Sequence, residues 1–159
     1  MIDNLIWGKS DIIFFDMPPG TWDIYFTFFQ KNIFFSSLLI TTPHNLSIND
    51  IVKTNTILDK YKSNKIGIVE NMSYHICENC GHKKNIFFHG NVKSLSKLLK
   101  IDYLYIMPIF SKFSNFLTND HLLNNFYVNV FFYKFLFKLF NFSYKKEFFF
   151  LINKKSFFI

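Results

Sequence analysis

The sequence has no alanine and no arginine, and only two cysteines in 159 residues. Two cysteines are too few for the disulfide framework of a small secreted domain, and the first residues lack the basic-then-apolar pattern of a signal peptide. We therefore expect a cytoplasmic, reducing environment. Long apolar runs are also missing, because Asn129, Lys134 and Lys138 interrupt the most hydrophobic stretch, residues 126–140. A membrane span needs about 18 uninterrupted apolar residues, so none is expected.

Phenylalanine and lysine are abundant instead. The chain has 24 phenylalanines and a net charge of +7. Residues with A/T-rich codons dominate the composition, which points to mutational bias in the gene rather than to a function. The lysines are scattered from Lys9 to Lys155, and no known nucleic-acid-binding motif accompanies them. A nucleic-acid partner is therefore not expected.

Short apolar runs alternate with amphipathic segments. Buried strands are expected at residues 11–15, 37–41, 65–69 and 103–106. One helix is expected with Ser47 as its N-cap, and another from about Asn91. Their expected apolar faces are Ile48, Ile51, Val52 and Leu58 in the first helix, and Val92, Leu95, Leu98 and Leu99 in the second. This alternation predicts an α/β fold with a parallel sheet.

The tail has a different pattern. From Asn124 onward, polar residues recur at steps of three and four among apolar ones, which predicts an amphipathic helix. Such a helix could cover one face of the sheet or lie on a membrane surface. Residues 146–159 show no usable pattern.

The two cysteines, Cys77 and Cys80, have the C-x-x-C spacing of metal ligands. One such pair supplies half of a four-coordinate site, so the other ligands must come from nearby histidines, from a cofactor sulfide or from a second copy of the chain. His75, His82 and His89 surround the pair and could complete a zinc site. A zinc-binding interaction module is therefore one alternative.

Polar residues follow two of the expected strands, where open parallel sheets bind their ligands. Asp16 could hold a magnesium ion there, Gly20 lets the backbone approach a phosphate, and Thr21 could donate a hydrogen bond to it. Asn71, after the third strand, could read the edge of a purine base. Each could equally be an ordinary turn residue.

Four motifs occur along the chain in one order. They are Asp16-Met-Pro-Pro-Gly-Thr21, Thr41-Thr-Pro43, Gly67-Ile-Val-Glu-Asn-Met-Ser73 and Cys77-Glu-Asn-Cys-Gly-His82. In sequence and order they resemble the Mrp/ApbC-type iron–sulfur cluster carriers, which are ATPases of the deviant P-loop class. The resemblance extends from about Leu5 to about Leu117.

The resemblance implies an incomplete doubly wound, mostly parallel sheet of the P-loop NTPase type with a C-terminal helix. Residues 1–123 would be the C-terminal part of the carrier domain, and residues 124–159 a terminal helix and tail. It also implies a 4Fe-4S cluster held between two copies in a homodimer and passed to recipient apoproteins, with ATP and magnesium controlling transfer.

By position in the motifs, Asp16 would be the catalytic switch aspartate that senses magnesium and the γ-phosphate. Gly20 and Thr21 would lie at the phosphates, and Asn71 would contact adenine. Cys77 and Cys80 would supply half of the cluster ligands.

The sequence departs from the family most clearly in lacking the phosphate loop G-x-x-x-x-G-K-[ST]. That loop provides most of the grip on the phosphates, so ATP hydrolysis by this chain alone is not expected. Its strand is central in the fold, and its loss would leave backbone groups unpaired. One hypothesis is a split carrier completed by a separate N-terminal half; the alternative is a decayed fragment without activity.

Overall fold

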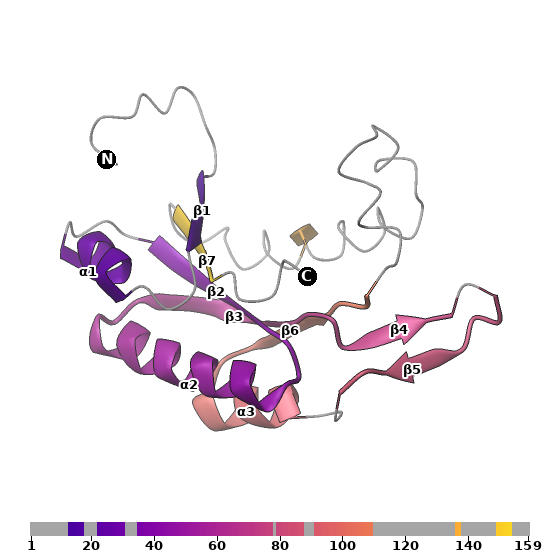
Figure 1. Cartoon of the computed structure of the whole chain (residues 1–159). Helices are drawn as coiled ribbons and strands as arrows, with labels where there is room; N and C mark the ends of the chain where they lie inside the picture. The colour runs from indigo at the N-terminus through magenta and orange to yellow at the C-terminus, as the bar shows by residue number, and fades with distance from the viewer. Residues whose placement is uncertain are drawn as a thin grey trace.

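The computed structural model describes residues 13–17, 22–30, 35–77, 79–87, 91–109, 136–137 and 149–153. Its elements are β1 (Ile13–Met17), α1 (Trp22–Gln30), β2 (Phe35–Thr41), α2 (Asn45–Lys60), β3 (Asn64–Glu70), β4 (Tyr74–Ile76), β5 (Lys83–Asn85), α3 (Asn91–Leu99), β6 (Tyr103–Ile106) and β7 (Phe149–Asn153). Five strands form a sheet in the order β1-β7-β2-β3-β6, and β4 with β5 forms a separate hairpin that projects from it (Figure 1).

All neighbouring strands of the five-stranded sheet are parallel. The predicted α/β fold with a parallel sheet is therefore confirmed, and all four expected strands are present. The bounds of β6 are those predicted, and those of β1, β2 and β3 differ because backbone pairing extends past the apolar runs that predicted them. β1 runs to Met17, so Asp16 lies inside the strand and not after it.

A strand that the sequence pattern did not predict lies in the interior of this sheet. β7 pairs with β1 on one side and with β2 on the other, so that Ile152 is the partner of both Asp16 and Leu38. The stretch expected to show no pattern thus supplies the strand between β1 and β2. The helix expected from Asn124 lies outside the described residues except for Leu136 and Phe137, which are helical.

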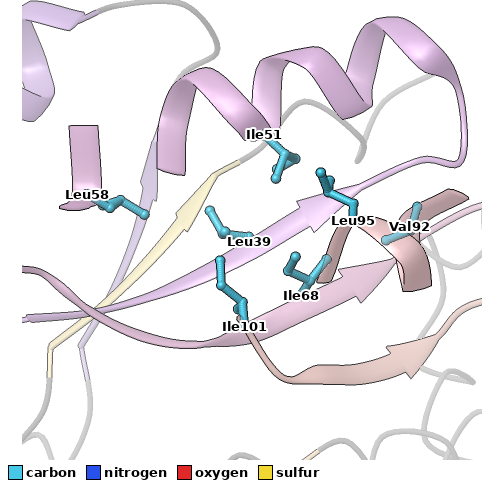
Figure 2. Close-up of a cluster of buried hydrophobic side chains, with 7 residues drawn as sticks. All are labelled: Leu39, Ile51, Leu58, Ile68, Val92, Leu95 and Ile101. Carbon is cyan, nitrogen blue, oxygen red and sulfur yellow. The ribbon is translucent and has the colours of Figure 1, made fainter. Parts of the chain in front are cut away.

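Both faces of the sheet are buried at β2 and β3. Leu39 of β2 and Ile68 of β3 face α2 and α3 and pack with residues from both helices (Figure 2). Leu38 and Val69, their neighbours in sequence, belong to a cluster on the opposite face. Because successive side chains of a strand point to opposite faces, the continuous apolar runs that predicted these strands give each face of the sheet a core.

The start of α2 differs from the prediction. His44, not Ser47, is the N-cap, since its Nδ1 accepts a hydrogen bond from the backbone N–H of Leu46 at 3.3 Å. Ser47 lies within the first turn, where its hydroxyl accepts a hydrogen bond from Thr42. A histidine nitrogen can serve as the cap acceptor in place of the usual serine oxygen.

Two residues assigned to the apolar helix faces are exposed. Val52 of α2 is 38% exposed and Leu98 of α3 is 77% exposed. Both lie at the edge of an apolar stripe that is otherwise buried, so the periodicity found the face but overestimated its width.

The helix α1 was not expected from the sequence. Its Tyr25 and Phe28 are buried against Met17 of β1, and the ring of Phe28 meets that of Phe15 edge-on at 4.9 Å. Phe29 stacks on Tyr61 at the end of α2. Aromatic contacts therefore hold this helix against both β1 and α2.

In the described part of the chain, no helix is long and apolar enough to cross a bilayer.

Replacing Gly67 with alanine should destabilise the sheet between β3 and β6. A Cβ at this position would lie 2.7 Å from the carbonyl oxygen of Asp102 and would also collide with the Leu104 side chain. Because one of these neighbours is backbone, we expect a loss of about 1–3 kcal/mol in the free energy of unfolding, measured by urea denaturation. Ser94→Ala on the exposed side of α3 is the control and should change it by less than about 0.5 kcal/mol.

Candidate functional site

The carboxyl ends of β1, β2 and β3 lie at one edge of the sheet, because the strands are parallel. Asp16 lies there, exposed, near the end of β1. The backbone N–H of Asn71, directly after β3, donates to the carbonyl oxygen of Thr41 at the end of β2 over 2.7 Å. The structure thus brings two of the predicted nucleotide residues to the same edge; Gly20 and Thr21 lie outside the described residues.

Asn71 is 7% exposed and forms part of the turn that follows β3. Its side-chain oxygen accepts a hydrogen bond from the backbone N–H of Met72 at 2.9 Å. Met72 has a φ of 54°, an unusual value for a residue other than glycine, so the turn is tight at this point. In this arrangement the amide oxygen of Asn71 stabilises the turn. The contact of Asn71 with adenine stays a prediction.

The neighbouring residue, Glu70, is a polar group for which the sequence suggested no role. Its side chain is 1% exposed, and its two carboxyl oxygens accept hydrogen bonds from the hydroxyls of Ser73 and Tyr103. Burial raises the pKa of the Tyr103 phenol, and the hydrogen bond to Glu70 and the charge of Glu70 raise it further. The signals in the sequence were an acidic residue at the end of an otherwise apolar run and its place in the motif Gly67-Ile-Val-Glu-Asn-Met-Ser73.

The cysteines lie at the end of a hairpin. β4 comes between β3 and the cysteines and pairs in antiparallel fashion with β5. The N–H of Cys77 donates to the carbonyl of His82 at 3.0 Å, and the N–H of Gly81 donates to the carbonyl of Cys77 at 2.9 Å. Gly81 has a φ of 68°, which glycine adopts without strain.

Both thiols are accessible and neither is in a disulfide. Cys77 is half-buried, and Cys80 is exposed. Two thiols on one tight turn can bind the same metal ion or adjacent irons of one cluster. The chemistry available at this end of the hairpin is therefore that of a two-thiolate ligand set open to a second molecule.

Two of the three histidines considered as zinc ligands lie on the same hairpin. His75 is half-buried in β4, and His82 is exposed just before β5, whereas His89 lies outside the described residues. Within the ranges that the structure describes, no group of three or more histidine, cysteine, aspartate or glutamate residues is arranged to hold a metal ion.

A positive charge lies beside the turn. The Nζ of Lys83, in β5, is 3.7 Å from the centre of the Tyr74 ring.

Iodoacetamide should modify Cys80 faster than Cys77 in the folded, reduced protein, because Cys80 is the more exposed of the two. Mass spectrometry of the peptides measures the two rates. The same reaction in guanidinium chloride is the control, where the difference should disappear. Equal rates in the folded protein would contradict this arrangement of the hairpin.

Comparison with known proteins gives the family. Residues 1–127 match the family described as ParA: NUBPL iron-transfer P-loop NTPase. The iron-sulfur cluster carrier protein of Escherichia coli (strain K12) is 37% identical over 109 residues, which cover 69% of this chain and 30% of that protein. The protein of the same name from Pyrococcus furiosus is 33% identical over 109 residues, which cover 69% of this chain and 37% of that protein.

A solved structure also aligns with the chain. It is a nucleotide-binding protein from Archaeoglobus fulgidus in complex with ADP, 24% identical, with a TM-score of 0.43 over 70% of this chain and 38% of that one. The chain spans about a third of the length of the carrier relatives that it matches. From the match over residues 1–127, the chain belongs to the ParA/NUBPL family of iron-transfer P-loop NTPases, as the resemblance of its motifs to the Mrp/ApbC-type carriers predicted.

Proposed function

We propose that this chain carries an iron–sulfur cluster and delivers it to apoproteins in the cytoplasm. The observation that supports this most directly is the pair of accessible thiols, Cys77 and Cys80, on a hairpin that begins at the carboxyl edge of the sheet. Relatives that are 33% and 37% identical are named iron-sulfur cluster carrier proteins. Family membership and the ligand set thus favour the same cargo.

In this proposal the cargo is a 4Fe-4S cluster shared by a homodimer. Such a cluster takes four thiolate ligands, and one chain offers two. A two-fold axis through the cluster would bring the same turn of a second copy to its other side. The exposed position of Cys80 leaves room for that second copy.

Transfer would proceed by exchange of ligands. A thiol of the recipient loses its proton and bonds to an iron, the bond from that iron to Cys77 or Cys80 breaks, and the released thiolate takes up a proton. Iron and sulfide keep their oxidation states, so no oxidant or reductant is needed. Exchange of this kind requires ligands that a recipient can reach, as the exposed thiol of Cys80 is.

The nucleotide part of the proposal needs a phosphate loop that these 159 residues do not contain. Asp16 offers an exposed carboxylate for magnesium, but the missing glycine-rich loop would provide most of the grip on the phosphates. These residues therefore do not fit ATP by themselves. ATP-dependent transfer would arise in a complex with a separate N-terminal half that supplies the missing loop.

Anaerobic reconstitution with ferrous iron and sulfide tests the cargo. We expect the wild type to turn brown, to contain iron and sulfide, and to elute as a dimer in size-exclusion chromatography. Cys77→Ser and Cys80→Ser should each lose most of the iron, because one thiolate per chain leaves the cluster with half its ligands.

His75→Gln is the matched control on the same hairpin and should retain the cluster. The zinc module, in which histidines complete the site, predicts the opposite: a colourless protein that binds one zinc per chain and loses it in His75→Gln or His82→Gln. A wild type that stays colourless and monomeric and takes up no iron under these conditions would rule out the carrier role.

A further inference from the structure

The buried carboxyl group of Glu70 joins three parts of the structure. Glu70 is the last residue of β3, and its side chain accepts hydrogen bonds from Tyr103, the first residue of β6, and from Ser73, directly before β4. Its own backbone carbonyl accepts a hydrogen bond from the N–H of Met107 at 2.7 Å, just beyond β6. One residue thus ties the sheet to the start of the cysteine hairpin.

Ser73 is the first of three residues that attach the hairpin to the rest of the structure. The carbonyl of Tyr74 accepts a hydrogen bond from the N–H of Ile109 at 2.8 Å, and His75 bridges to Ile109 as well. Besides the bond from its hydroxyl to Glu70, Ser73 donates its N–H to the carbonyl of Met107 at 3.0 Å, and its carbonyl accepts from the N–H of Ile86 at 3.3 Å, after β5. The side chain of Ser73 is fully buried. Both ends of the hairpin therefore meet at a residue whose side chain is held by Glu70.

The hairpin converts small rotations at its base into larger movements of the thiols. Cys77 lies two residues beyond His75, the last residue of β4 that bridges to Ile109, and this distance is roughly 7 Å along an extended strand. A rotation of about 10° at the base would move the thiol by roughly 1 Å over that length. Metal–sulfur bonds tolerate only about 0.2 Å, so a ligand on such an arm must be held at its base.

We propose that Glu70 is the positioning residue of the cysteine hairpin: by holding Ser73 against Tyr103, it fixes the direction in which Cys77 and Cys80 project from the sheet. This deepens the proposed function and rests on it where the cluster is concerned. The hydrogen bonds from Ser73 and Tyr103 are made to a buried carboxyl group, where an unmade bond is more costly than at the surface. The hydroxyl of Tyr103 is protonated at neutral pH, as that of an ordinary tyrosine is, and can therefore donate; its raised pKa extends this to higher pH.

The first test follows loss of the cluster from protein reconstituted with ferrous iron and sulfide. In Glu70→Ala and Ser73→Ala, release to EDTA, followed by visible absorbance, should be about tenfold faster than in the wild type, the factor that corresponds to losing one hydrogen bond to a charged group. Glu70→Gln should restore slow release, because serine and tyrosine hydroxyls can either donate to the amide oxygen or accept from the amide nitrogen.

Phe28→Leu is the control for stability. Phe28 is buried in α1, in a core cluster with Met17 and Tyr25 that includes none of Glu70, Ser73 and Tyr103, so this variant lowers the melting temperature without touching Glu70. We expect its release rate to equal that of the wild type. Equal acceleration in Phe28→Leu and Glu70→Ala would mean that Glu70 only stabilises the fold, and would overturn the proposal.

A second test requires no cluster. With Cys77→Ser and Ser94→Cys in the same chain, spin labels on Cys80 and on position 94 in α3 report the spread of distances between hairpin and helix by pulsed EPR. The distribution should be narrow in this background and with Glu70→Gln, and clearly broader with Glu70→Ala. An unchanged width with Glu70→Ala would refute the positioning role, even if the wild type carries a cluster. If the wild type carries no cluster but Glu70→Ala still broadens the distance distribution, only the proposed cargo is refuted.

Discussion

Parallel pairing of β3 with β2 on one side and β6 on the other is the constraint on which the rest of the structure depends. It buries every residue of β3 from Ile66 to Glu70 and forces the carboxyl ends of the strands to one edge. The chain must leave the sheet there, through a turn that includes Asn71 and Met72, and the cysteine hairpin begins where that turn ends. The place of the thiols relative to the sheet is therefore a consequence of strand pairing.

The strands of the core could be predicted because a buried parallel strand is apolar along its whole length. The run around Ile68 is of this kind, and so is the run around Leu39. The ends of these strands were harder to predict, since backbone pairing continues into polar residues such as Asp16 and Glu70 that no hydrophobic pattern includes. The cap of α2 was misplaced for a related reason: either His44 or Ser47 could accept the hydrogen bond, and geometry alone selects His44.

The sequence predicted the ligands of the candidate site but not the structure that supports them. The C-x-x-C spacing singled out Cys77 and Cys80 as ligands, which stays a prediction, whereas the motif order predicted the family, which the comparison confirmed. The hairpin that carries them was missed, because β5 reads Lys-Lys-Asn and is fully exposed, without any alternation of apolar residues. Its pairing with β4 is a tertiary effect. The contacts of Glu70 with Ser73 and Tyr103 were equally hidden, because Tyr103 is 33 residues away in the chain.

β7 lies in the interior of the sheet, next to β1, although about 130 residues separate these two strands in the sequence. Among the described strands, β1 pairs with β7 alone, so residues 13–17 have no ladder until residues 149–153 have been synthesised. Contacts between such distant segments form slowly, and an apolar strand that waits for its partner can pair with other chains. During translation, the segment that bears Asp16 would therefore stay unpaired until the chain has reached residue 153.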